Sequence, residues 1–354
     1  MGFDPGSGDD RIAMSSEAEY PRSVFIYELI TGGGLLSVAE SPAPSGSLLQ
    51  EGTAMLAAVV EDFAAIPGTS VTILRDHRIE PLSVAANKQI VVRSAQEEHE
   101  TFVEAVRSTE ATLVIAPEFD GLLLERTQWT EAHEGRLLSP GSDFVELATC
   151  KWKTYQHWLA AGVPTIETYF VGDIASWHHL RNLPVVTKPR DGAGSEEVVC
   201  WKMGKQVKAE VEPNEKILIQ PKVCGAPVSC AVLGSGGDIV PLPAGYQRLS
   251  KGFKYHGGSL PLPEPLLERA HRLTGQAIRS FPPFNGYVGL DMILGPCPDG
   301  TEDVAVEVNP RLTSSYVGLR LLLKNNLAQS MLDVAAGKAF VPQPGCGGVD
   351  FEIH

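Results

Sequence analysis

The most informative segment of this 354-residue chain lies near its C-terminal end and reads Ala305-Val306-Glu307-Val308-Asn309-Pro310-Arg311. Successive side chains of a β-strand point to opposite faces, so Glu307, Asn309 and Arg311 are expected to project to one side. Val306 and Val308 are expected to enter the core on the other side. Magnesium prefers carboxylate and amide oxygens and completes its shell with substrate phosphates and water. Because the planar guanidinium of arginine suits a phosphoryl oxygen, this order of side chains predicts a metal site beside a transferring phosphate.

A second carboxylate lies upstream, where Asp291 interrupts the otherwise apolar run at 289–294. The turn-rich loop at 295–301 separates this run from the first segment and favours an antiparallel hairpin. Such a hairpin brings Asp291 within reach of Glu307, and two carboxylates about 5 Å apart repel each other unless a divalent cation lies between them. The sequence therefore predicts a metal site at Asp291, Glu307 and Asn309. The alternative is that Glu307 and Asn309 face water at the edge of a sheet.

A strand that ends in lysine precedes a glycine-containing loop at 185–195, with the sequence VVTKPRDGAGS. Backbone N–H groups of such a loop can bind phosphate oxygens, and Lys188 at its root adds a positive charge. Because a lysine directed into the face of a sheet needs an anionic partner, the position of Lys188 favours a phosphate site. Gly192, Gly194 and Ser195 are the loop residues expected at the phosphates. An ordinary turn of the same composition is the alternative.

The strand near 216–220 leaves through Gln220-Pro221-Lys222-Val223. An adenine ring needs an acceptor for its amino group and a donor for a ring nitrogen. The carbonyl of Pro221 and the N–H of Val223 would supply both. A proline on an edge strand, which has no N–H to lose from the sheet, is the alternative explanation.

Outside these segments the pattern of apolar residues predicts two kinds of sheet. Strands at 23–27, 71–74 and 111–116 alternate with helices at 48–66 and 97–108, which is typical of a small parallel sheet wrapped by helices. After a helix at 151–161, short strands between Gly or Pro turns favour antiparallel pairing, and they lie at 185–188, 198–201, 216–220 and 228–233. The remaining expected elements are a long helix at 265–280, strands at 289–294 and 303–308, and helices near 314–324 and 327–336.

Composition excludes several classes of protein. The chain carries 29 basic and 43 acidic residues, a net charge of −14, whereas general duplex and membrane-surface binding need a basic stripe. The six cysteines show no C-x-x-C spacing, so a zinc ribbon and a disulfide scaffold are both disfavoured. Residues 1–20 are acidic and rich in small residues, without the apolar core of an export signal. We expect a soluble cytoplasmic protein whose first 20 residues are a disordered tail.

Five features of the chain, taken in order, resemble the ATP-grasp carboxylate–amine ligases. They are Lys151 at a helix start, Lys188 before DGAGS, the 220–223 hinge, Asp291 and the 307–311 segment. The resemblance covers roughly residues 149–341, and members of this family join a carboxylate to an amine with ATP and magnesium. It implies an ATP-grasp fold, α/β and α+β, behind an N-terminal Rossmann-like (pre-ATP-grasp) domain. The implied boundaries are 21–148 for the Rossmann-like domain with its connector, 149–225 for the lid subdomain and 226–354 for the C-terminal subdomain with the metal site.

The resemblance also implies roles for individual residues. These are Lys151, Lys188, Gly192, Gly194, Ser195, Gln220, Pro221 and Val223 for ATP, Asp291, Glu307 and Asn309 for magnesium or manganese, and Arg311 with Lys188 as catalytic residues at the transferred phosphoryl group. The chain departs from the family pattern in two places. Cys150 stands where the family often has Asp, and residues 225–233 include no acid for the ribose hydroxyls, for which Ser229 is the expected substitute.

Two further segments, Tyr27-Glu28-Leu29-Ile30-Thr31-Gly32-Gly33-Gly34 and residues 309–318, resemble the tyramine–L-glutamate ligase branch of methanofuran biosynthesis, which belongs to one-carbon metabolism. This likeness implies an amide bond formed between L-glutamate and tyramine through an acyl phosphate. Gly33, Gly34, Arg248 and Lys254, within the segments 31–34, 247–248 and 254–258, are the expected substrate contacts. Each of these segments is alternatively a plain turn or a solvated loop.

Three other functions remain open at this point. A different amino-acid or peptide ligase of the same fold is the nearest alternative, and a non-catalytic nucleotide-binding regulatory protein is the second. A dinucleotide-dependent oxidoreductase is disfavoured because Gly32-Gly33-Gly34 is not the G-x-G-x-x-G fingerprint, and the chain also lacks a P-loop motif. The expected partners are small-molecule substrates, with no nucleic acid and no membrane, and a homodimer is an expectation drawn from the family alone.

Overall fold

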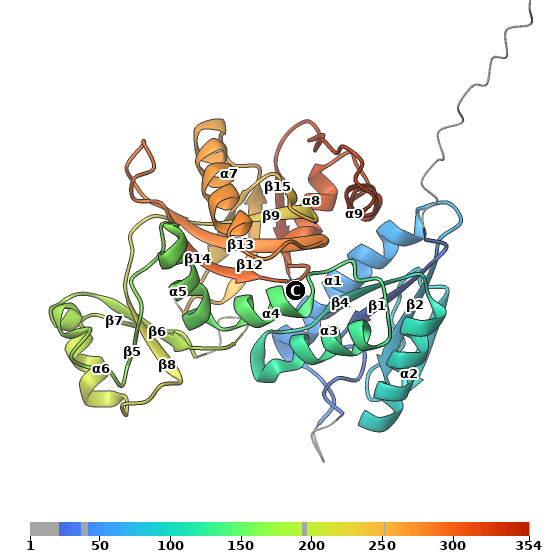
Figure 1. The fold of residues 1–354 in the computed structure, drawn as a ribbon, viewed down its shortest axis with the longest axis horizontal. Coiled ribbons are helices and arrows are strands. Elements are labelled where there is room, and N and C mark those ends of the chain that lie inside the picture. The colour runs from blue at the N-terminus through green and yellow to red at the C-terminus, as the bar shows by residue number, and fades with distance from the viewer. Residues whose placement is uncertain (1–20, 37–41, 193–196, 251, 354) are drawn as a thin grey trace, which may run out of the picture.

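The computed structural model describes residues 21–36, 42–192, 197–250 and 252–353, so the expected tail lies outside the described residues. Three sheets follow one another along the chain, one parallel and two antiparallel (Figure 1). The expected order, an α/β unit followed by antiparallel sheets, is therefore confirmed. In the described part of the chain, no helix combines the length and apolar character needed to cross a membrane.

The first sheet is parallel, with strand order β3-β2-β1-β4. Its strands are β1 (Ser23–Glu28), β2 (Ser70–Asp76), β3 (Lys88–Val92) and β4 (Ala111–Ile115), and its helices are α1 (Gly46–Ala64), α2 (Ala95–Ser108), α3 (Leu122–Ala132) and α4 (Ser142–Thr149). Every residue of β4 is buried, as expected for a strand covered by helices on both faces. The edge strand β3 was not predicted, because its sequence KQIVV opens with polar residues.

The second sheet, β5-β8-β6-β7, is antiparallel. Its strands are β5 (Tyr169–Phe170), β6 (Val185–Pro189), β7 (Val199–Trp201) and β8 (Ile217–Pro221), accompanied by α5 (Lys151–Ala161), α6 (Gly204–Glu210) and a short 3-10 turn, η2 (His178–Asn182). Helix α5 ends at Gly162, whose φ of 71° is a left-handed conformation that glycine adopts without strain. The predicted bounds of this helix and the antiparallel pairing of β6 with β7 and β8 are confirmed.

The third sheet has the order β14-β13-β9-β11-β12-β15, with β10 paired to β9. Its strands are β9 (Ala226–Ser235), β10 (Asp238–Pro241), β11 (Gly245–Leu249), β12 (Tyr255–Leu260), β13 (Gly286–Leu294), β14 (Val304–Asn309) and β15 (Val349–Glu352), and its helices are α7 (Glu264–Arg279), α8 (Ser315–Leu322) and α9 (Leu327–Ala335). The predicted strands at 289–294 and 303–308 form the hairpin β13–β14.

Helix α1 joins the first sheet to the C-terminal helices. Leu56 and Phe63 of α1 belong to the same hydrophobic cluster as Leu319 of α8 and Met331 of α9. The buried carboxylate of Asp62 accepts hydrogen bonds from the Tyr316 hydroxyl at 2.7 Å and from Arg320 Nη2 at 2.8 Å. These contacts hold α1 in one position relative to the third sheet, although α1 precedes α8 by some 250 residues in the sequence. The expected domain boundaries stay a prediction.

Candidate active site

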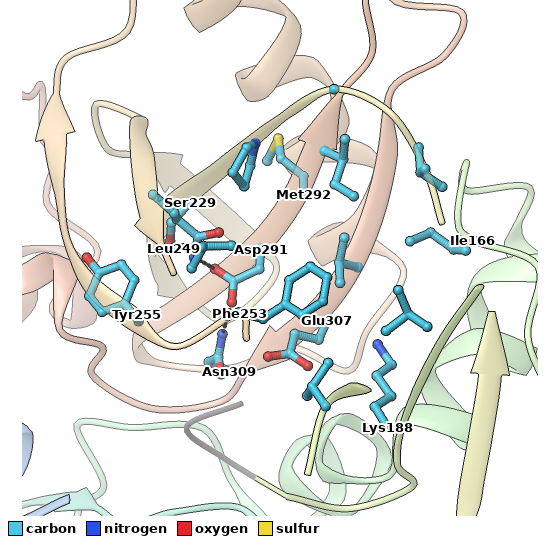
Figure 2. Close-up of a pocket in the computed structure, with 18 of the residues that line it drawn as sticks. Ile166, Lys188, Ser229, Leu249, Phe253, Tyr255, Asp291, Met292, Glu307 and Asn309 are labelled. Atoms are coloured by element: carbon cyan, nitrogen blue, oxygen red, sulfur yellow. Dashed lines mark hydrogen bonds between the residues drawn. The ribbon is translucent and has the colours of Figure 1, made fainter. Parts of the chain in front are cut away.

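A cavity of about 370 Å³ has walls from the second and third sheets and from helix α1. Lys188 of β6 enters from one side, and Asp291, Glu307 and Asn309 of the β13–β14 hairpin enter from the other (Figure 2). Arg311, two residues beyond β14, also lines this cavity. The structure therefore brings together the side chains that the sequence assigned to metal and phosphoryl chemistry.

The two carboxylates face each other across the hairpin, as the sequence predicted. Asp291 and Glu307 are register partners in the antiparallel pair β13–β14. Strand β14 is the edge strand of its sheet, yet Glu307 is directed into the cavity and not toward bulk water. Among the described residues, no three His, Cys, Asp or Glu side chains group as a metal site, so the oxygen ligands here are two carboxylates and the Asn309 amide.

One detail of the predicted strand is wrong. The register passes from Asp291 opposite Glu307 to Met292 opposite Ala305, which leaves Val306 as the extra residue of a β-bulge. Val306 therefore lines the cavity beside Glu307, and Ala305 takes the buried position that was predicted for Val306. The strict alternation assumed for an ideal strand holds only from Glu307 onward, where Val308 is buried as predicted.

Asp291 and Glu307 differ in charge environment although they are paired. Asp291 accepts a hydrogen bond from Gln247 Nε2 at 2.9 Å and from Asn309 Nδ2 at 3.2 Å. Burial, and next the negative charge of Glu307, raise the pKa of Asp291 to about 7. Burial also acts to raise the pKa of Glu307, but Lys151 and Lys188 outweigh it, so this pKa lies below its ordinary value.

This donor set fits a divalent cation. The carboxylate pair is partly buried. Burial and repulsion by Glu307 drive Asp291 toward protonation, although two lysines and Arg311 lie nearby. A cation bound between Asp291 and Glu307 would remove that repulsion, and oxygen donors of this kind suit magnesium better than a soft metal. Two carboxylates and an amide leave room for phosphate oxygens and water in the shell of the ion.

Two lysines supply positive charge at the same end of the cavity. Lys188 is buried, and burial lowers its pKa to about 8 despite the opposing influence of Glu307. Lys151, the first residue of α5, donates to the carbonyl of Gly192 at 2.7 Å, and its Nζ lies 3.6 Å from Glu307 Oε2. Lys151 thus connects the glycine loop to the carboxylate pair. Gly192 has a φ of 149°, a backbone conformation that favours glycine.

Two of the expected loop residues, Gly194 and Ser195, lie outside the described residues. At the hinge, Gln220, Pro221 and Val223 line the cavity, and their contact with adenine stays a prediction. Gln220 is buried, and its Nε2 donates to the Thr168 hydroxyl at 2.8 Å. This end of the cavity is mainly apolar, with Ile166, Val186, Pro227, Met292 and Ile293 among its lining residues. Such walls beside backbone groups suit a flat heteroaromatic ring.

Ser229, the expected substitute for a ribose-binding acid, lines the cavity on β9. It is the register partner of Asp291, so it lies beside the carboxylate pair.

Arg311 has an acidic partner that could not be predicted from the sequence. Its Nη2 donates to Glu118 Oε2 at 3.0 Å, and its Nε lies 2.8 Å from Glu118 Oε1. Glu118 immediately precedes a short 3-10 turn, η1 (Phe119–Gly121), after β4 of the first sheet. Both side chains are largely buried. The N-terminal part of the chain therefore holds the arginine of the cavity.

The four expected substrate contacts do not line this cavity. Gly33 and Gly34 are buried within the N-terminal part, where added Cβ atoms would meet Val92 and Leu29. Arg248 bonds to the Phe351 carbonyl and pairs with the acidic residues of β15, and Lys254 is exposed. Gln247 and Tyr255, which adjoin Arg248 and Lys254 in the sequence, line the cavity in their place. From the N-terminal part, Glu51 of α1 lines it.

Comparison with known proteins identifies two domains in the chain. Residues 148–315 match the ATP-grasp domain model, and residues 69–145 match the pre ATP-grasp 3 domain model. The chain is 25% identical over 304 residues to the tyramine–L-glutamate ligase of Methanocaldococcus fervens, covering 83% of this chain and 93% of that protein.

Two solved structures share the fold. The biotin carboxylase of Campylobacter jejuni, solved with β,γ-ATP, superimposes with a TM-score of 0.70 at 15% identity, over 93% of this chain and 74% of that one. The L-amino acid ligase of Bacillus licheniformis superimposes with a TM-score of 0.65 at 17% identity, over 92% and 76%. Together with the two domain matches, this fold shows that the chain is an ATP-grasp protein with a pre-ATP-grasp domain, a member of the ATP-dependent carboxylate–amine ligase family.

Proposed function

We propose that this protein uses ATP and magnesium to join a carboxylate to an amine through an acyl phosphate. The observation that carries the proposal is the convergence of Asp291, Glu307 and Asn309 with Lys188 and Arg311 on one cavity. Phosphoryl transfer depends mainly on positioning and on offsetting negative charge, and this cavity offers groups for both.

The reaction divides into two displacements. A carboxylate oxygen of the acid attacks the γ-phosphorus of ATP, the bond to the β-phosphate oxygen breaks, and ADP leaves. The amine nitrogen then attacks the acyl carbon, phosphate leaves, and the nitrogen loses a proton to give the amide. Lys188 and Arg311 offset the charge on the transferring phosphoryl group, and Lys151 holds the loop at Gly192 against the site.

Asp291, Glu307 and Asn309 would hold magnesium. When bound, the ion neutralises charge on the phosphate oxygens of ATP. The apolar end near Pro221 and Val223 would take the adenine, with Gln220 fixed by Thr168 at its border.

For the substrates, we propose L-glutamate as the acid and tyramine as the amine. The support is the similarity to the tyramine–L-glutamate ligase of Methanocaldococcus fervens along most of both chains. A place in methanofuran biosynthesis rests on this substrate pair, and another amino-acid pair is the second candidate.

The experiment is mass spectrometry of the products formed with ATP, magnesium, L-glutamate and a panel of amines that includes tyramine, run beside an ADP-release assay. We expect a glutamyl amide and one ADP for each amide. Amide formation with a different acid or amine would support the proposed ligase activity and overturn the proposed substrates. No ADP release with any pair would favour a nucleotide-binding regulatory protein.

A further inference from the structure

Glu51 is a carboxylate of the N-terminal part that reaches the cavity of the ATP-grasp part. It lies on α1 and lines the same cavity as Lys188 and Asp291. The position of α1 is fixed from its other end, where Asp62 accepts hydrogen bonds from Tyr316 and Arg320. Glu51 is therefore held at the cavity by the packing of the whole helix.

The charge of Glu51 is only partly offset there, by Arg311 and Lys254, with which no ion pair forms within the described residues. Within the described residues, its hydrogen-bond partner is the Ser314 hydroxyl, at the long distance of 3.4 Å, and no ion pair to Glu51 is found among them. Burial raises the pKa of Glu51, although Arg311, the Ser314 hydroxyl and Lys254 act in the opposite direction. The guanidinium of Arg311 is already engaged by both oxygens of Glu118. A partly buried carboxylate that faces a cavity in this way calls for a cation from a ligand.

The surroundings of Glu51 combine apolar, aromatic and charged groups. A small adjoining pocket of about 30 Å³ shares Glu51 and Arg311 with the main cavity, and its other walls include Leu48, Met55, Ile115 and the carboxylate of Glu28. Tyr255 also lines the main cavity, and burial followed by the charges of Asp291 and Glu51 raises the pKa of its hydroxyl, so the ring stays neutral. An aromatic face beside a carboxylate is a favourable environment for an ammonium group.

Charge also separates the two ends of the cavity. Lys188 and Lys151 lie at the carboxylate pair, where phosphates and the acid substrate are expected. In Figure 2, Asp291 lies between Lys188 and Tyr255, so the end with Tyr255 is the one away from the buried lysine. Arg311 lines both pockets together with Glu51, so an amine held at Glu51 lies beside the arginine assigned to the phosphoryl group.

We propose that Glu51 binds the ammonium group of the amine substrate, a primary amine whose body is apolar or aromatic, and accepts the proton that this nitrogen must lose before it attacks the acyl carbon. This inference rests on the proposed function, which makes the cavity the place where an amine substrate binds. It can nevertheless be tested by measuring amine binding alone. Glu51 thereby becomes a specificity-determining residue contributed by the N-terminal part of the chain.

The test is the Kd of tyramine, measured by calorimetry on the full chain, for the wild type, Glu51→Gln and Glu61→Gln. Glu61→Gln is the matched control, because Glu61 lies on the same helix, is about half exposed and does not line the cavity. Glu61 pairs with Arg320 at 3.1 Å, so this variant also tests whether a weaker contact between α1 and α8 alone changes binding. Loss of a charge-assisted contact predicts a Kd raised about tenfold to a hundredfold in Glu51→Gln. Glu61→Gln is expected to bind as the wild type does. Melting curves establish that both variants are folded.

Kinetics separate this inference from the proposed function. In Glu51→Gln we expect KM to rise for the amine and to stay unchanged for L-glutamate and ATP. Equal tyramine affinity in wild type and Glu51→Gln, or no measurable binding to the wild type, would overturn the inference. A rise in KM for the acid in place of the amine would do the same. Absence of amide from the wild type, with tyramine binding still dependent on Glu51, would overturn the proposed function alone.

Discussion

Arg311 and Glu118 form a two-point ion pair between segments 193 residues apart, with Nη2 3.0 Å from Oε2 and Nε 2.8 Å from Oε1. The pair is largely buried, and it fixes the plane of the guanidinium at the edge of the cavity. Since Arg311 is the arginine assigned to the transferred phosphoryl group, the N-terminal part of the chain controls its orientation. Glu118 is in this sense a positioning residue that does not itself line the cavity.

We predict that Glu118→Gln lowers kcat/KM for the acid substrate by about tenfold, because Arg311 loses the partner that orients it. Removing one member of a buried pair also leaves an uncompensated charge, which predicts a loss of about 3 to 5 kcal/mol in the free energy of unfolding. Steady-state kinetics and urea denaturation check the two effects. Glu118→Asp is expected to recover part of the activity, and Glu100→Gln, at an exposed position on α2, serves as control. Full activity in Glu118→Gln would refute the positioning role.

The hydrogen bonds that Asp62 accepts predict that the stability of the fold and the binding of the amine are linked. Asp62→Ala removes the acceptor for the buried Tyr316 hydroxyl and for Arg320, so we expect the free energy of unfolding to fall by about 3 kcal/mol. Because the same helix carries Glu51, KM for the amine should rise more than KM for ATP. Denaturation curves and KM values measure both effects. An unchanged midpoint would show that Asp62 does not hold α1 in place.

The depressed pKa of Lys188 predicts a pH-dependent stability difference. Between about 8 and the ordinary value of 10.5, the unfolded chain binds this proton more readily than the folded chain does, so unfolding becomes less favourable as pH rises. The cost of the buried charge is therefore fully present below about pH 8 and declines toward pH 10.5.

Lys188→Met should accordingly be more stable than the wild type at neutral pH, by up to about 3 kcal/mol, and this advantage should shrink at higher pH. The same variant should lose ADP release, because the phosphoryl group loses a positive charge. Urea denaturation of both proteins across this pH range provides the measurement. A stability difference that is constant with pH would contradict the assignment.

Much of the fold was predictable because its elements are encoded locally. The apolar spacing of α1 and the β-rich runs of β1 and β4 identify these elements without reference to the rest of the chain. Strands β11 and β12, with the sequences GYQRL and YHGGSL, were not predicted, because polar residues and glycines obscure their alternation. Their pairing with β9 and β15 stabilises them in the folded chain.

The residues of the site also differ in how far they could be predicted from the sequence. The pairing of Asp291 with Glu307 followed from one short hairpin, so the sequence could predict it. The bulge at Val306 has no marker in the local sequence. Glu118 and Glu51 reach the cavity through packing between distant segments, which a single sequence does not reveal. Arg248 has the charge of a ligand-binding residue, but β15 takes up that charge in the folded chain.

The carboxylate pair is best tested by magnesium-dependent ADP release in Asp291→Asn and Glu307→Gln, with Asp299→Asn in the hairpin loop as control. We predict that the rate of ADP release falls at least about a hundredfold in both site variants and is unchanged in the control. Asp291→Asn should melt at or above the wild-type temperature, since it removes one of two repelling charges, and Glu307→Gln below it, since Lys151 and Lys188 lose their anion. Wild-type rates of ADP release in both site variants would contradict the metal site and the ligase built on it.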